Sequence, residues 1–119
     1  YWKLWALLSS AQNRAQQYTD AEESSKRLLE MFPGCEPAYG ELREALNGQD
    51  RHEEAYNLMR FAASQMPESL GVHLNLALAA KRAGHTDEAV GLATGIRQAL
   101  EGNQEALSEV SSILQEIEA

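Results

Sequence analysis

Residues 39–67, YGELREALNGQDRHEEAYNLMRFAASQMP, hold one copy of a pattern that recurs along this 119-residue chain. Its bulky, apolar, alanine and proline positions return at intervals of 34 residues. The recurring sets are Trp5, Tyr39, His73 and Leu107; Leu8, Leu42, Leu76 and Val110; Ala21, Ala55 and Ala89; and Pro33 and Pro67. A period of this length is typical of helical arrays, in which each unit packs on its neighbours and the stack forms a long surface. The repeat therefore favours a binding scaffold over an enzyme.

Proline and glycine divide the chain into segments rich in strong helix formers, with no alternating β-branched run and no hairpin signal. The expected helices are 2–16, 19–32, 37–47, 51–65, 70–83, 86–100 and 104–117. Connections this short make neighbouring helices antiparallel. The sequence predicts an all-α fold, an α-α superhelical solenoid of antiparallel helix pairs in one domain, residues 1–119. The repeats fall at 2–34, 36–68 and 70–102, followed by a terminal helix at 103–118.

The short breaks between helices carry residues that are typical of helix ends. Thr19 and Glu22 have capping-box spacing, and Asp50 and Thr86 precede or open helical patterns. These residues are the expected N-caps of second helices. The glycines expected to end first helices are Gly48 and Gly84, and the residues expected at or just before the starts of first helices are Gly34, Ser69 and Asn103.

The recurring residues resemble the tetratricopeptide repeat (TPR), a helix-turn-helix unit of this length. The residues that carry the resemblance are Trp5, Leu8, Ser9, Ala21 and Pro33; Tyr39, Leu42, Arg43, Ala55, Ala62 and Pro67; His73, Leu76, Ala77, Gly84 and Ala89; and Leu107, Val110, Ser111 and Leu114. The resemblance covers nearly the whole chain. Four residues depart from the pattern: Arg43 stands where a small residue is usual, Leu28 and Ile96 stand where alanine is usual, and Glu101 replaces the proline.

Composition argues against several classes of function. The formal net charge is −8, which opposes binding to phosphate backbones, so no nucleic-acid partner is expected. The single cysteine, Cys35, excludes an internal disulfide and a cysteine-based metal site, and we interpret it as a loop or helix-start residue. No histidine pair has zinc-site spacing, and no glycine-rich phosphate loop is present. We therefore expect no cofactor, no metal, no catalytic residue and no direct insertion into a membrane.

Several polar and aromatic residues have simple structural interpretations. The acidic pairs Glu22-Glu23, Glu53-Glu54 and Asp87-Glu88 open second helices, where they oppose the helix dipole. His73 aligns with Trp5 and Tyr39, which favours packing over catalysis. The aromatic cluster at the start of the chain, Tyr1, Trp2 and Trp5 with Leu7 beside it, is interpreted as the seam to a preceding repeat.

The resemblance implies that the first helices of successive repeats line a concave face that holds a peptide or a partner helix. The groove residues expected by register are Asn13, Arg14, Glu41, Glu44, Asn47, Leu74, Asn75, Leu78, Lys81, Arg82 and Glu109. Family members that bind chaperone tails use a lysine- and asparagine-rich clamp for a terminal carboxylate. The matching positions here are Ala6, Ser10, Glu41, Gly71 and Asn75, so this ligand is not expected.

The function expected from the sequence is a non-catalytic scaffold that binds a partner protein or peptide. By analogy of fold, we expect it within a bacterial cell-envelope assembly or a polysaccharide export or secretion system, with a periplasmic location favoured over a cytoplasmic one. The chain has no initiating Met, and we interpret it as a segment of a longer protein whose flanking repeats stack on it. Two alternatives remain: a structural spacer within a longer array, and a regulatory domain attached to an enzyme or a transcription regulator.

Overall fold

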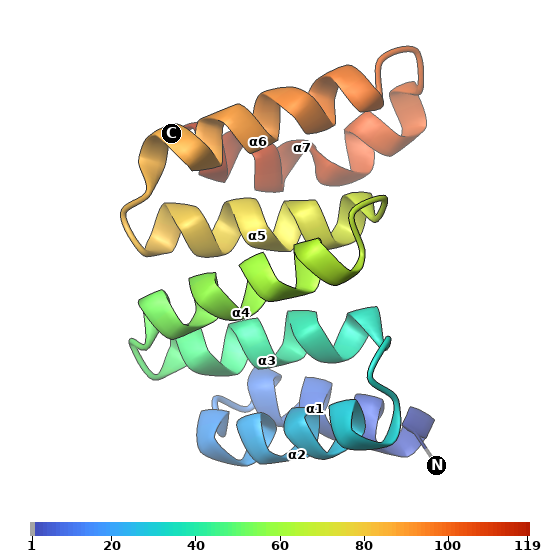
Figure 1. Cartoon of the computed structure of the whole chain (residues 1–119), viewed down its shortest axis with the longest axis vertical. Coiled ribbons are helices and arrows are strands. Elements are labelled where there is room, and N and C mark those ends of the chain that lie inside the picture. The colour runs from blue at the N-terminus through green and yellow to red at the C-terminus, as the bar shows by residue number, and fades with distance from the viewer. Residues whose placement is uncertain (1) are drawn as a thin grey trace.

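The computed structural model describes residues 2–119, which form seven helices and no strand. The helices are α1 (Trp2–Arg14), α2 (Tyr18–Met31), α3 (Glu36–Gly48), α4 (His52–Gln65), α5 (Leu70–Arg82), α6 (Thr86–Ala99) and α7 (Gln104–Glu118). They stack in chain order into an array of 37 × 27 × 26 Å (Figure 1). The predicted all-α solenoid is confirmed, and each predicted helix agrees with the observed one to within two residues.

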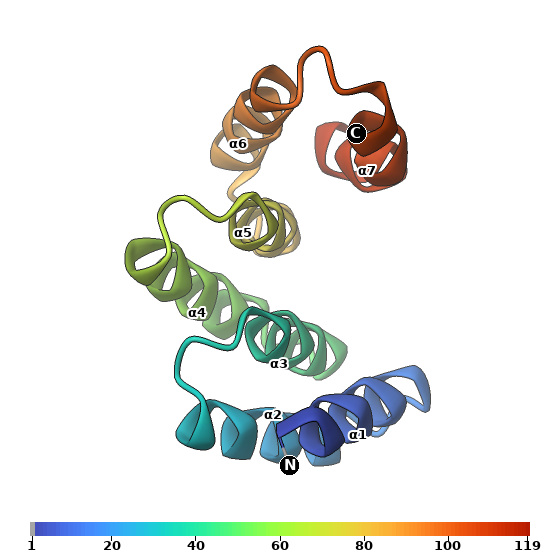
Figure 2. The same ribbon diagram turned by 90° about the vertical axis from the view of Figure 1, so that its right-hand side faces the viewer.

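The array is curved, and its two sides are formed by different helices. Figure 2 shows α1, α3, α5 and α7 on one side and α2, α4 and α6 on the other. The helices at the two ends, α1 and α7, bend the first side inward, so that the first helix of each pair lines the inside of the curve. We call this inner side the concave groove.

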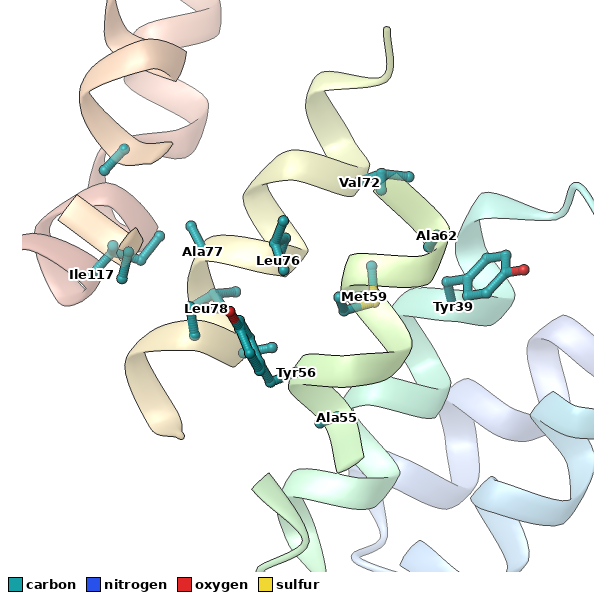
Figure 3. Close-up of a cluster of buried hydrophobic side chains, with 14 of the residues drawn as sticks. Tyr39, Ala55, Tyr56, Met59, Ala62, Val72, Leu76, Ala77, Leu78 and Ile117 are labelled. Carbon is teal, nitrogen blue, oxygen red and sulfur yellow. The ribbon is translucent and has the colours of Figure 1, made fainter. Parts of the chain in front are cut away.

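Small residues at the repeated positions allow the helices to approach closely. Ala21, Ala55 and Ala89 have no exposed surface, so neighbouring helices pack directly against their methyl groups. Larger side chains fill the space beside them, as Tyr56, Met59 and other residues do in the main core (Figure 3). The alternation of small and large residues explains why a 34-residue period specifies this stack.

The departures from the repeat pattern are accommodated inside the protein. Leu28 is fully buried and forms a second, smaller cluster with Cys35 and Ala38, against which Trp5 packs. Ile96 is also buried, in the main core. Cys35 is the N-cap residue of α3, as expected of a helix-start residue. Tyr1, the first residue of the aromatic cluster, lies outside the described residues.

Three predicted N-caps of second helices are wrong. The N-cap residues of α2, α4 and α6 are Gln17, Arg51 and His85, and none of them accepts a side-chain cap bond. Thr19 and Thr86 lie inside their helices, and Asp50 lies one residue before the cap. By contrast, Ser69 Oγ accepts the N–H of Val72 at 3.1 Å and Asn103 Oδ1 accepts the N–H of Ala106 at 3.1 Å. These two residues cap α5 and α7.

In each of the three helix pairs, a residue with left-handed backbone conformation lies in the turn between the first helix and the second. Gln16, Asp50 and Gly84 have φ values of 61°, 59° and 89°, and these positions are again 34 residues apart. Only the third carries glycine, the residue that adopts this conformation without strain. The predicted role of Gly84 is therefore confirmed. Gly48 instead lies in the last turn of α3, where the ring of Tyr18 occupies the space that a Cβ would need.

Candidate functional site

The groove residues expected from the sequence differ in how far the structure exposes them. Arg14, Glu44, Arg82 and Glu109 are exposed, and Glu41, Leu74, Asn75 and Lys81 are partly exposed. Asn13, Asn47 and Leu78 are buried, with 2%, 4% and 9% of their surface accessible. The structure therefore places these three residues beneath the groove surface, where they support it and are not free to bind a partner.

The two buried asparagines connect helices. Asn13 Nδ2 in α1 donates to the Glu41 backbone oxygen at 2.9 Å and to Glu41 Oε2 at 2.7 Å. His52 Nδ1 donates to Asn47 Oδ1 at 2.9 Å and so links α3 to α4. Glu41 is consequently held by α1. Glu44, one turn further along α3, is exposed and has no ion pair within residues 2–119.

A hollow of about 390 Å³ opens between α3 and α5 on the groove side. Two glycines, Gly40 in α3 and Gly71 in α5, contribute no side chain to it. Polar side chains around it are Glu36, Glu41, Arg43, Glu44 and Asn75. A concave site with a few convergent polar groups is the usual form of a binding site.

Arg43 and Glu36 are polar residues of this hollow that were not among the groove residues expected by register. Arg43 also makes a contact between repeats. Its Nε donates to Asn75 Oδ1 across the repeat boundary at 2.7 Å. Burial lowers the pKa of the guanidinium, and the carboxylate of Glu44 opposes this effect. The one sign of Arg43 in the sequence was that an arginine stands where the repeat has a small residue. By itself that signal indicated only a departure from the repeat pattern, whereas the structure shows a guanidinium that lines a hollow.

The far end of the groove carries both signs of charge. Lys81 and Arg82 lie in the last turn of α5, and Arg82 Nη2 is 3.8 Å from Glu116 Oε1 in α7. The middle of the groove is more acidic because Glu36, Glu41 and Glu44 surround the hollow. The groove therefore presents an acidic centre and an end of mixed charge to a partner.

The acidic pairs predicted at the starts of second helices also connect successive repeats on the other side of the array. Glu22 Oε1 accepts Arg51 Nη1 at 2.7 Å and Gln49 Nε2 at 3.0 Å. The next repeat boundary has similar contacts. His85 Nε2 donates to Glu53 Oε2 at 3.1 Å, and the Tyr56 hydroxyl donates to Glu88 Oε1. These contacts use the carboxylates for assembly of the stack, so they are not a candidate acid–base site.

Another hollow, of about 650 Å³, lies on the outer surface of α2. Four of its five charged residues already pair with one another: Lys26 Nζ is 2.7 Å from Glu22 Oε2, and Arg27 Nη2 is 3.5 Å from Glu23 Oε1. Within residues 2–119, no group of three or more His, Cys, Asp or Glu side chains is placed to hold a metal ion. None of the described helices combines the length and the apolar character that crossing a bilayer requires.

Comparisons with known proteins agree with the fold. No protein-family model matches the sequence, and no curated protein sequence matches it. The structure is similar to SycD, a type III secretion translocator chaperone of Yersinia enterocolitica, in its alternative dimer, with a TM-score of 0.82 and 14% identity over 98% of this chain and 88% of that one. SycD in complex with a peptide of the translocator YopD matches with a TM-score of 0.78 and 16% identity over 98% and 88% of the two chains.

A third structure of SycD matches with a TM-score of 0.75 and 16% identity, over 97% of this chain and 81% of that one. At such low identity, the likeness shows a shared TPR-like fold. It does not by itself assign a ligand to this chain.

Proposed function

We propose that this protein is a non-catalytic scaffold whose concave groove binds a peptide segment of a partner protein. The observation that carries the proposal is the polar hollow lined by α3 and α5. These two helices lie on the inner side of the curve (Figure 2). An open groove formed by successive helix pairs offers a long surface and no enclosed reaction chamber. This shape suits a chain segment better than a small substrate.

The structural neighbours support the same proposal. One of the SycD structures contains a peptide of the translocator YopD, so this fold is able to hold a peptide. Among the settings suggested by the sequence, this likeness favours a secretion system over polysaccharide export. Glu44 is exposed in the hollow and has no ion pair within residues 2–119. We therefore expect the groove to prefer a peptide segment whose centre is neutral or basic.

The test is a charge reversal at the centre of the groove. A random dodecapeptide library displayed on phage is selected on the wild-type protein, and the affinities of enriched peptides are measured by fluorescence anisotropy. Glu44→Lys should weaken the binding of these peptides by about tenfold or more, because it places a like charge against a basic segment. Glu44 is preferred to Glu41, whose carboxylate also holds Asn13.

The matched control is Glu101→Lys, which makes the same change of charge at an exposed residue in the turn between α6 and α7. This variant should bind the peptides as the wild type does. Equal affinity of the wild type and the Glu44→Lys variant for every enriched peptide would contradict binding in the groove. Failure of the wild type to enrich any peptide above the Glu44→Lys background would contradict it as well.

One observation favours a second candidate function, a spacer within a longer stack. Leu4 and Ala11 of α1 are exposed, whereas the residues one repeat later are fully buried. The buried equivalents are Ala38 and Ala45 in α3. The outer face of α1 therefore corresponds to the face that a preceding helix pair covers in later repeats. Leu7, with 64% of its surface exposed, extends this apolar face.

The spacer hypothesis predicts that an added repeat increases stability. A copy of residues 35–68 placed directly ahead of Tyr1 continues the 34-residue register. We expect it to raise the melting temperature by several degrees, because stacking buries the leucines of α1. In the same extended chain, Leu4→Lys with Leu7→Lys should remove the gain. An unchanged melting temperature, measured by circular dichroism, would argue against a stacking role.

A further inference from the structure

We propose that Arg43 is the anchor of the groove and that it binds a main-chain carbonyl of an extended peptide segment with a basic side chain beside Glu44. This inference rests on the proposed function and names the form and chemistry of the ligand. The repeat pattern has a small residue at this position, so the pattern alone gives Arg43 no role in binding. It is carried by the orientation of the guanidinium, its remaining donors and the charges around it.

The guanidinium is oriented by two successive hydrogen bonds. Asn75 Nδ2 donates to the Gly71 backbone oxygen at 3.0 Å, which fixes the amide one helical turn along α5. Asn75 Oδ1 then accepts Arg43 Nε at 2.7 Å. Because Arg43 is in α3 and Asn75 is in α5, this arrangement forms only when two repeats are stacked. Asn75 is therefore a positioning residue for Arg43.

The two Nη atoms of the guanidinium carry donors that have no partner within residues 2–119. Arginine carries N–H donors on Nε and on both Nη atoms. Within residues 2–119, only Nε has a hydrogen-bond partner, and no carboxylate lies within ion-pair distance of the Nη atoms. Arg43 is also partly buried at the edge of the hollow. A ligand oxygen that accepts from the Nη groups thus satisfies donors that water reaches only in part.

The charges around the hollow favour a carbonyl oxygen over a carboxylate as the ligand atom that accepts from Arg43. Glu36, Glu41 and Glu44 line the same hollow, so a ligand carboxylate would meet three negative charges there, against the positive charges of Arg43 and of Arg82 close to it. A neutral carbonyl oxygen avoids this repulsion. A lysine or arginine next to it in the ligand pairs with Glu44, which is exposed.

The shape of the hollow selects an extended backbone. A helical ligand uses its main-chain carbonyls internally, whereas an extended segment leaves them free to accept hydrogen bonds. Gly40 and Gly71 leave room for a backbone to approach, since they place no side chain in the hollow. A Cβ at Gly71 would be 3.7 Å from Glu36 Oε2, so even a small side chain would begin to fill this space.

The first experiment measures the affinity of wild type, Arg43→Gln and Arg43→Lys for the peptides enriched by phage display. Both substitutions should weaken binding by about tenfold or more, because glutamine lacks the charge and lysine lacks the paired Nη donors. In a scan that replaces each peptide amide by an ester, one position should weaken binding to wild type, since an ester carbonyl is a poorer acceptor. The same ester should have little effect on the Arg43→Gln variant. Both variants should keep the helical circular dichroism spectrum of the wild type, with at most a small fall in melting temperature from the lost bond to Asn75.

Asn75 supplies a second measurement. Asn75→Asp keeps an acceptor for Arg43 Nε, whereas Asn75→Leu removes it. The Nε–Hε signal of Arg43 in nitrogen-15 NMR spectra should remain protected from exchange in the aspartate variant and lose its protection in the leucine variant. Peptide affinity should fall in the leucine variant alone.

The outcomes separate this inference from the proposed function. If Glu44→Lys abolishes peptide binding and Arg43→Gln does not change it, the groove binds peptides but Arg43 is not the anchor. If no ester position couples to Arg43, or the bound peptides are helical by circular dichroism, the carbonyl assignment is overturned. If Glu44→Lys also has no effect, both the inference and the proposed function are wrong.

Discussion

Met59→Ala should lower the free energy of unfolding by about 3 kcal/mol, a large part of the stability of a domain this size. Met59 in α4 has no exposed surface. It points into the core that also contains Tyr39 and Leu76, from the first helices of two repeats (Figure 3). Truncation would remove its apolar contacts and leave a cavity that stacked helices cannot readily close. Urea titration monitored by circular dichroism would measure the change.

Met31→Ala is the matched control, because it makes the same chemical change at a residue with 51% of its surface exposed. Its effect on stability should be within about 0.5 kcal/mol, as is usual for surface substitutions. Equal losses in the two variants would show that the repeats are not held together by the core described here.

The free energy of unfolding should fall as the pH is lowered below 4.5, and protonation of Glu22 should account for part of that fall. Burial opposes ionisation of Glu22, but hydrogen bonds from Lys26, Gln49 and Arg51 outweigh this and lower its pKa from 4.5 to about 2. A carboxyl whose pKa is lower in the folded state stabilises that state above its unfolded pKa. The contribution is therefore complete above pH 4.5 and is lost as the pH falls towards 2.

The shift from 4.5 to about 2 corresponds to about 3 kcal/mol. Lys26, with 56% of its side chain exposed, is screened by water, so we expect the measured contribution to be about 2 kcal/mol. Glu22→Gln should destabilise the protein by this amount at pH 7. The difference between wild type and variant should shrink between pH 4.5 and 2, as measured by chemical denaturation at each pH.

Glu23→Gln provides the control, since Glu23 is the neighbouring carboxylate and 69% of its side chain is exposed. This substitution should leave both the stability and its dependence on pH nearly unchanged. A difference between wild type and Glu22→Gln that stays constant from pH 7 to 2 would contradict the assigned role of Glu22.

The predictions that failed concern places where two helices meet. Thr19, Asp50 and Thr86 have good capping chemistry, but left-handed residues at Gln16, Asp50 and Gly84 change the direction of the chain just before each second helix. The cap therefore falls on Gln17, Arg51 or His85. Only glycine marks this conformation clearly in a sequence, so two of the three positions carried no recognisable signal.

The candidate site was predicted in outline but not in detail. Register placed the groove candidates on first helices, and the structure brings Glu41, Glu44 and Asn75 to one hollow. Register could not separate the exposed Glu44 from the buried Asn13, because burial depends on how closely the next helix approaches. It also left Arg43 as a departure from the pattern without a role, since the partner that orients this side chain lies one repeat further along the chain.

The sequence by itself determined the helices, their antiparallel pairing and the alanines buried at 34-residue intervals. Local propensity and a repeated small-and-large pattern are enough to specify these features. Only the tertiary structure decided which polar residues line the groove, where the left-handed turns lie and how Asn75 orients Arg43. These features depend on distances between repeats, which are set by the sum of many packed side chains and are not written in any one segment.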